Sequence, residues 1–159
     1  MNWGEFVDVC PEIAEPARGR FEADELVLLG TLRADGSPRI SPNEVDFAKD
    51  RLLLGMMWRS RKVADLRRDP RIVVHSLPSD RANPGGDLKL YGRAVNESDP
   101  KIRGAYRRAI RARIDWAPEE PEYHLFSLDV ESASSVVFGE DRRALMWDPE
   151  RGLRQREVG

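Results

Sequence analysis

Three consecutive residues, Ser60, Arg61 and Lys62, carry the clearest chemical signal in this sequence. They follow a short apolar run, residues 51–56, which is long enough for a buried strand and too short for a helix. Ser60 stands where a helix N-cap belongs, so Arg61 and Lys62 fall in the first helical turn. Cations are unfavourable there, because free N–H groups already make that end partly positive. They make sense if an anion binds, since the N–H groups, hydroxyl, guanidinium and ammonium together form a phosphate cradle.

The strength of such a cradle follows from ordinary hydrogen-bond energies. A hydrogen bond to a charged group contributes roughly 1.5–3 kcal/mol. Three of them would hold a phosphate ester at about micromolar level if the rest of the ligand stacks on the protein. The alternative is a solvated basic helix, ended by Pro70, whose arginines pair with Asp65 and Asp69. The pattern alone fits both interpretations equally well.

Composition and charge exclude several classes of function. The chain has 159 residues, enough for one domain with a sizeable core, and its charges nearly cancel at net −2. That balance gives no general attraction to nucleic acid or to anionic membranes. Cys10 is the only cysteine, so no intramolecular disulfide can form. Because no signal peptide or membrane-spanning run is visible, we expect a cytoplasmic protein. With His75 and His124 far apart, no His/Cys metal site is expected.

The first half of the chain predicts a helical cover followed by a hairpin. Residues 1–24 have helical spacing with breaks, Pro11 opening a second helix and Pro16 interrupting it. Residues 26–32 and 38–47 predict two strands joined by a turn at 34–36. Pro38 and Pro42 lack N–H donors, so the second strand must be an edge or carry a bulge. Such a strand leaves backbone groups free for a flat ligand, and Asn43 brings an amide there; an irregular edge is the alternative.

The second half of the chain predicts more short strands around one long basic helix. The helix begins after Asp99 with Pro100 in its first position and runs to about residue 114. The further strands are expected at 71–76, 88–95, 123–130, 136–138, 143–147 and 153–156. Many short strands with few helices indicate a mostly β protein of α+β type, an antiparallel barrel with peripheral helices. No linker divides the chain, so residues 1–159 are predicted to be one domain, with 1–24 as its helical cover.

At this point the sequence resembles a known family, the FMN-binding split barrel of the pyridoxamine 5'-phosphate oxidase type. It is similar in particular to small actinobacterial members, which pair with flavin or with the deazaflavin coenzyme F-420. The order of the segments carries the resemblance, which extends over most of the chain from residue 26 onward. The segments are LLGTLRADGSPRISPNEVDF, the strand–SRK–helix–DPRIVVH unit, LKLYGRAV, YHLFSLDV and MWDPERGLRQRE.

The resemblance implies a set of cofactor-binding residues. In the oxidase the Arg and Lys of the SRK motif bind the FMN phosphate, the two residues ending the preceding strand touch the cofactor, and a C-terminal Trp belongs to the site. Together with the pattern, this predicts cofactor binding by Asn43, Gly55, Met56, Trp58, Ser60, Arg61, Lys62, Trp147 and Arg156. No catalytic side chain is predicted.

The substrate end of the oxidase site does not carry over. The oxidase has an Arg and a Lys in the strand under the flavin ring, where this chain has Ser41 and Asp46. A Gln near the ring corresponds to Asp87, and the spacing from Trp147 to Arg156 differs by about a residue from the oxidase pattern. The resemblance therefore implies the phosphate site without implying pyridoxamine phosphate as the substrate.

The resemblance also implies a homodimer with two cofactors at the subunit interface. A flat ring needs two apolar walls, and Met57, Trp58 and Trp147 are candidates, with Trp147 reaching across from the partner; ordinary core or dimer contacts are the alternative. Arg59 or Arg81 near the cradle would favour the polyanionic deazaflavin over FMN.

The function expected on these grounds is hydride transfer between a bound flavin, FMN or deazaflavin, and a small organic substrate. Two other classes stay open from the sequence. One is a module that binds or sequesters the cofactor without turnover. The other is a split-barrel dimer that binds haem or no cofactor at all.

Overall fold

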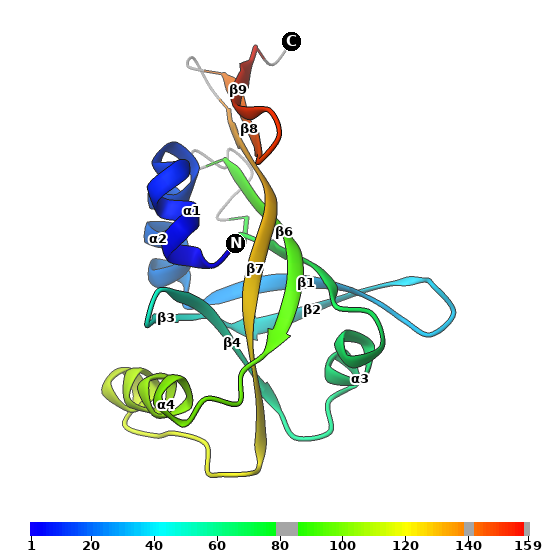
Figure 1. Cartoon of the computed structure of the whole chain (residues 1–159), viewed down its shortest axis with the longest axis vertical. Helices are drawn as coiled ribbons and strands as arrows, with labels where there is room; N and C mark the ends of the chain where they lie inside the picture. The colour runs from blue at the N-terminus through cyan, green and yellow to red at the C-terminus, as the bar shows by residue number, and fades with distance from the viewer. Residues whose placement is uncertain (79–85, 139–141, 158–159) are drawn as a thin grey trace.

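Nine antiparallel strands form one strongly curved sheet in the computed structural model, which describes residues 1–78, 86–138 and 142–157 (Figure 1). The order is β2-β1-β5-β6-β7-β4-β3, with β8 paired to β7 and β9 to β8. The strands are β1 (Leu26–Leu32), β2 (Pro38–Glu44), β3 (Asp46–Ala48), β4 (Arg51–Met57), β5 (Arg71–His75), β6 (Asp87–Asn96), β7 (Tyr123–Val137), β8 (Arg143–Asp148) and β9 (Gly152–Arg156). The sequence therefore predicted the strand-rich, mainly antiparallel class correctly.

The longest strand, β7, divides the sheet into two parts. It pairs with β6 along one edge, while its other edge pairs first with β4 and then with β8. The sequence predicted two strands here, at 123–130 and 136–138, and this was wrong. The intervening serines read as a loop, yet β6 and β8 supply partners for them. One extra residue is absorbed where the register shifts between Tyr91 and Gly92 of β6.

Two N-terminal helices, α1 (Trp3–Val9) and α2 (Pro11–Asp24), pack on the inside of the curved sheet. Pro11 opens α2 as expected, but Pro16 lies inside the helix and does not interrupt it. A proline there removes one helix hydrogen bond. Burial of Ile13, Ala17 and Phe21 on the same helix outweighs that loss, because each fully buried large apolar side chain contributes about 1.5–3 kcal/mol.

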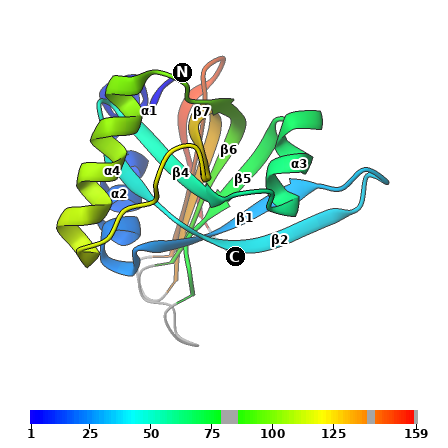
Figure 2. The ribbon, with the colours of Figure 1, turned by 90° about the horizontal axis from the view of Figure 1, so that it is seen from below.

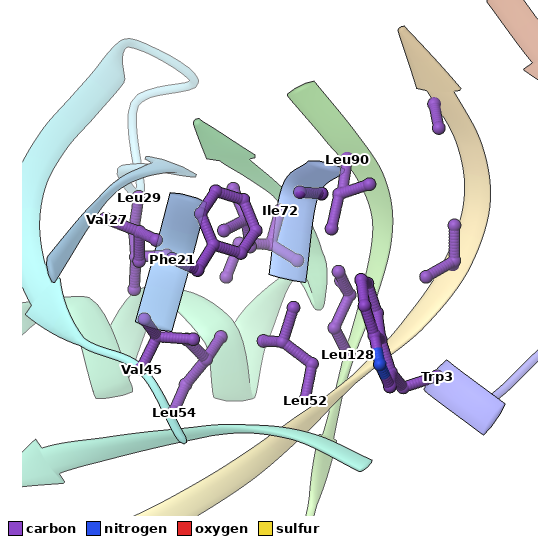
Figure 3. Close-up of a cluster of buried hydrophobic side chains, with 14 of the residues drawn as sticks. Trp3, Phe21, Val27, Leu29, Val45, Leu52, Leu54, Ile72, Leu90 and Leu128 are labelled. Atoms are coloured by element: carbon purple, nitrogen blue, oxygen red, sulfur yellow. The ribbon is translucent and has the colours of Figure 1, made fainter. Parts of the chain in front are cut away.

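The main core lies between these helices and the strands. Figure 3 shows Phe21 and Trp3 lying among aliphatic side chains of β1, β4, β5, β6 and β7, including Val27, Leu29, Leu52, Leu54, Ile72, Leu90 and Leu128. Cys10 is buried in the same cluster, and burial raises the pKa of its thiol. No helix in the described ranges is both long and apolar enough to span a membrane.

The remaining helices lie outside the sheet's core on different sides. α3 (Arg61–Arg68) follows β4 and packs near β1, while α4 (Pro100–Ile114) lies against β3 (Figure 2). Asp99 caps α4 as predicted, its carboxylate accepting from the backbone N–H of Lys101 at 2.8 Å. α4 buries Tyr106 and Ile110 in a second apolar cluster with Leu53 of β4.

Strand β2 is an edge of the sheet, as Pro38 and Pro42 predicted. It pairs with β1 over its full length, and in the described part of the chain it has no second ladder partner. Its far side nevertheless approaches β4. The barrel therefore closes between β2 and β4 without a backbone ladder, and this closure will be called the seam.

An arginine of α4 gathers three carboxylates and fastens the helix to the sheet. Arg113 lies 3.2 Å from Asp46, 3.4 Å from Glu25 and 3.9 Å from Glu44. One guanidinium cannot neutralise three acids, and Asp46 is the most buried of them. Burial, with the nearby Glu44 and Glu25, raises the pKa of Asp46 to about 6 despite the attraction of Arg113.

This shift makes the stability of the protein depend on pH. The folded-state pKa of Asp46 lies above its unfolded value, so the stabilising contribution is present below about pH 4 and is lost as the pH rises through about 6. Asp46→Asn removes the ionisation, so its free energy of unfolding should improve relative to wild type by up to about 3 kcal/mol between pH 4.5 and 7.5. Urea unfolding at several pH values measures this. The exposed Asp8→Asn serves as control, and parallel curves for Asp46→Asn and wild type would contradict the assignment.

Candidate functional site

The start of α3 has unsatisfied polar groups, which is unusual for a helix start. Ser60 is the N-cap in extended conformation, but its side chain makes no capping hydrogen bond. Its Oγ is buried and has no partner in the described part of the chain. The first turn holds Arg61 and Lys62 and no acidic residue. A buried hydroxyl without a partner costs roughly 1–3 kcal/mol, so this arrangement suits a ligand that completes it.

Lys62 is pinned beside β2. Its Nζ donates to the carbonyl oxygen of Pro42 at 2.9 Å, across the seam. The side chain is half-buried, and burial lowers the pKa of its ammonium group. No ion pair to Lys62 exists among the described residues. The partner of this half-buried cation in the described chain is a neutral carbonyl, so an anionic ligand could still balance its charge.

The alternative of a solvated, internally paired basic helix explains only part of α3. Asp65 pairs with Arg68 at 3.3 Å, within the helix, as that interpretation required. Asp69 instead pairs with Arg71 of β5 at 2.5 Å. Arg61 is exposed and, like Lys62, forms no ion pair within the described ranges. Within the described chain, Arg68 is thus paired with Asp65 and Arg67 contacts the ring of His124, whereas the two cations of the first turn have no ion pair.

The seam brings two more predicted residues to the same place. Asn43 is buried, and its Nδ2 donates to the carbonyl oxygens of Glu44 at 2.6 Å and of Gly55 at 3.1 Å. This amide therefore bridges β2 and β4. Gly55 has no room for a side chain, because a Cβ there would lie 1.6 Å from the hydroxyl oxygen of Tyr106. Asn43, Gly55 and Lys62 thus lie together at the seam.

Met56 has a different environment from its neighbour. Its side chain is buried in the main core with Leu54 and Leu52 of the same strand. Any contact of Met56 with a ligand at the seam would have to come from its backbone. The sequence could not distinguish this, because a strand that ends at a site alternates between its two faces.

Trp58 and Met57 form an exposed apolar turn before α3. Met57 is 80% exposed and Trp58 46% exposed. The indole of Trp58 stacks on the buried His124 of β7, with ring centroids 4.7 Å apart and planes 14° from parallel. Arg67 lies 3.3 Å from Nδ1 of His124, and burial together with Arg67 and Arg103 lowers the pKa of this histidine. His124 is therefore a neutral support for Trp58, a role that spacing alone did not reveal.

Trp147 and Arg156 lie away from the seam in one chain. Trp147 is 4% exposed and packs edge-on against Phe6, 5.1 Å between centroids. This placement matches the interpretation as an ordinary core contact and leaves its ring no exposed face. Arg156 is exposed on β9, in the hairpin at the opposite end of the long axis from α3 (Figure 1). Arg59, with a left-handed φ of 60°, is in the turn before α3, whereas Arg81 is outside the described residues.

No group of three or more metal-ligating side chains is assembled within the residues that the structure covers. One ring nitrogen of each histidine, Nδ1, also has a polar neighbour. His75 Nδ1 lies 2.5 Å from the carbonyl oxygen of Ser76, and His124 Nδ1 lies beside Arg67. What the seam offers chemically is therefore an anion site at the start of a helix, next to an exposed aromatic turn.

This fold and this site define a split barrel, and comparison with known proteins identifies the family. Residues 13–137 match the profile of the pyridoxamine 5'-phosphate oxidase family. The match covers most of the chain, so the protein belongs to that family, as its resemblance predicted. A search of curated proteins found no match.

Solved structures show the same fold at low sequence identity. A pyridoxamine 5'-phosphate oxidase-related, FMN-binding protein from Nostoc punctiforme has a TM-score of 0.69 and 15% identity, over 97% of this chain and 96% of that one. PhzG from Burkholderia lata, in complex with tetrahydrophenazine-1-carboxylic acid, has a TM-score of 0.63 and 15% identity, covering 98% and 92%. A haem-binding protein from Mycobacterium smegmatis has a TM-score of 0.61 and 17% identity; the match covers 90% of this chain but only 57% of that one.

The close approach at Gly55 gives a stability prediction. Gly55→Ala forces Tyr106 to move away from β4 and should destabilise the protein by about 1–3 kcal/mol. Gly19→Ala is a matched control, because a Cβ there meets no atom within 4 Å and α2 should gain about 0.5–1 kcal/mol. Urea unfolding of both variants measures the difference. Equal effects of the two substitutions would show that the seam has room for a side chain.

Proposed function

We propose that this protein binds a phosphorylated flavin, FMN or a deazaflavin, with the phosphate at the start of α3. The observation that supports this most directly is the set of unsatisfied groups there. Ser60 Oγ is buried without a described partner, and Lys62 is half-buried and bonded only to a carbonyl. Arg61 is exposed in the same turn without an ion pair in the described part. A phosphate dianion would accept hydrogen bonds from all three and from the free N–H groups of the helix.

The fit of the residues to a flavin is better at the phosphate than at the ring. The phosphate needs cations and N–H donors, which α3 provides. The ring needs apolar faces, and the exposed Met57–Trp58 turn, supported by His124, offers one. A single chain does not present a second wall, because Trp147 is buried in its own core. The second wall would come from a partner subunit, as in the homodimers that the family resemblance implies.

In such a complex the flavin supplies hydride transfer, and the chain supplies binding and orientation. Lys62, Arg61 and Ser60 would hold the phosphate, and Trp58 would limit where the ring can lie. Asp46, which replaces a basic residue of the oxidase, pairs with Arg113 of α4, and its carboxylate would repel a substrate phosphate. We therefore propose an oxidoreductase acting on a small organic substrate other than pyridoxamine phosphate.

The M. smegmatis neighbour raises haem as a second candidate. A haem iron usually needs an axial ligand such as a free histidine nitrogen. His124 is buried under Trp58 with Nδ1 beside Arg67, and Nδ1 of His75 is engaged by Ser76. The stacking on Trp58 disfavours His124 as an iron ligand, whereas the carbonyl contact at Nδ1 of His75 leaves Nε2 as the nitrogen that would bind a haem iron. The visible spectrum of the purified protein separates flavin, deazaflavin and haem, and reduction of a bound flavin by NAD(P)H separates an enzyme from a storage module.

The phosphate site is tested by charge removal. Lys62→Ala and Arg61→Ala should each weaken FMN binding about 10- to 100-fold, since each removes one charge-assisted hydrogen bond. Riboflavin, which lacks the phosphate, should bind both variants and the wild type alike. Flavin fluorescence titration measures all of these affinities.

Lys101→Ala, at an exposed position in the first turn of α4, is the matched control. It should leave FMN affinity unchanged. If Lys62→Ala weakens the binding of FMN and of riboflavin alike, the substitution has perturbed the structure. If FMN affinity is unchanged in both variants, the proposed phosphate cradle is wrong.

The proposed homodimer has a candidate surface on the outer face of the sheet. Cross-strand pairing places Ile40, Gly30, Val73 and Tyr91 in one row over β2, β1, β5 and β6. Ile40 is 73% exposed and Tyr91 42% exposed. None of the helices packs on these side chains, to judge from the described core clusters. Exposed apolar rows of this kind on a sheet commonly mark association surfaces.

Tyr91→Arg should therefore shift the protein from dimer to monomer, because it places a charge at the β6 end of the row, beside Val73. Trp116→Arg, at an exposed position after α4, should leave the mass unchanged. Light scattering after size-exclusion chromatography, at several protein concentrations, gives the mass. A wild-type protein that stays monomeric at the highest concentration would exclude the proposed homodimer.

A further inference from the structure

A hollow of about 330 Å³ lies between α3 and the turn that joins β1 to β2. Figure 2 shows this turn extending past α3 on the same side of the molecule. Three separate segments contribute its polar lining, which contains four guanidinium groups and two carboxylates. This is a surplus of two positive charges in a chain whose net charge is −2. The charged residues are Arg33, Asp35, Arg39, Arg61, Asp65 and Arg68.

A buried carboxylate holds two of these arginines in place. Asp65 is almost fully buried, and its Oδ2 accepts from Thr31 at 3.0 Å and from Nε of Arg39 at 2.6 Å. Its Oδ1 accepts from Arg68 at 3.3 Å. Burial alone would raise the pKa of Asp65, but these hydrogen bonds outweigh it and keep the pKa below its usual value. Asp65 is therefore charged and positions Arg39 and Arg68 at the hollow.

The guanidinium groups have N–H donors that make no hydrogen bond to the described residues. Each arginine has five N–H groups. Arg39 uses Nε on Asp65, and Arg68 uses Nη2 on Asp65 and on the carbonyl of Leu32. Arg61 has no hydrogen bond or ion pair within the described ranges. The other carboxylate, Asp35, is occupied by the backbone N–H and hydroxyl of Ser37, at 2.9 and 2.6 Å.

Gathering four guanidinium groups around one hollow is costly unless negative charge enters it. The two carboxylates offset two of them, and the remaining repulsion is relieved by a bound anion. Guanidinium groups match the planar, bidentate geometry of phosphate and carboxylate oxygens. The volume corresponds to roughly ten water molecules, which is enough for a diphosphate or a small tricarboxylate.

We propose that this hollow is a second anion-binding site, separate from the helix start, for a phosphate or carboxylate group of a small molecule. Arg61 lies in the first turn of α3 and also lines the hollow, so the two anion sites adjoin. An occupant of the hollow would be either a second ligand beside the flavin or a further anionic group of the same ligand.

The test uses inorganic pyrophosphate and citrate as probes, titrated calorimetrically into the full-length protein at constant ionic strength. Wild type should bind at least one of them. Arg33→Gln should weaken that binding about 5- to 10-fold, because one charge-assisted contact is removed. Arg33 is exposed at the β1–β2 turn, so the variant should fold normally. Arg108→Gln, at an exposed position on α4, is the matched control and should bind like wild type. The tighter probe identifies phosphate or carboxylate as the preferred group.

Lys62→Ala separates this proposal from the flavin proposal. It should lose FMN affinity and keep the binding of the probe anion. If Lys62→Ala abolishes probe binding, the anion occupies the helix start and the hollow is not a site. The proposal is also overturned if neither probe binds, or if Arg33→Gln behaves like Arg108→Gln. If the wild type fails to bind FMN yet binds the probe in an Arg33-dependent way, the hollow stands and the flavin proposal fails.

Discussion

The barrel closes at the seam through side chains, and the candidate site depends on this closure. A ladder between β2 and β4 would use up the backbone groups of both strands, but Pro42 has no N–H to contribute. Asn43 instead reaches the carbonyl of Gly55, and Lys62 reaches the carbonyl of Pro42. These two bonds place the first turn of α3 against the open edge. Lys62 is thereby held beside the unpaired edge of β2, and Arg61 lies exposed in the same turn.

The sequence predicted this region well because its signals are local. Ser60 before two cations and Pro70 after the helix fixed the limits of α3, and the prolines of β2 identified an edge. Local signals failed where distant partners decide the outcome. The serines of β7 are a strand because β6 and β8 flank them, and Pro16 is tolerated because its helix is buried in the core. The contact of Trp58 with His124 joins residues 66 positions apart, and no spacing rule reveals such a pair.

The residues that the oxidase resemblance predicted for the phosphate and for the ring of the cofactor have different environments in the structure. Arg61 and Lys62 of the motif lie in the first turn of α3, where the proposed phosphate site needs cations. At the ring end, Trp147 fills its own core and Arg156 lies on a distant hairpin. Cations without a counter-charge lower the stability of the ligand-free protein, whereas a tryptophan buried in the core raises it. In the part of the chain that the structure describes, the start of α3 thus leaves its cations without ion pairs, whereas β8 buries its tryptophan in the core.

Strand β7 is paired on both of its edges near each of its two ends. Strand β6 runs along one edge, and the other edge pairs with β4 and then with β8. The β8–β9 hairpin, by contrast, has β7 as its ladder partner in the described chain, and Trp147 of β8 anchors it against Phe6. Opening the hairpin leaves the β6–β7–β4 part of the sheet intact, whereas opening β7 dismantles both halves. The amide protons of β7 that are flanked on both edges, at residues 126–127 and 133–136, should thus be among the slowest to exchange with solvent, and the outer edge of β9 should fray first.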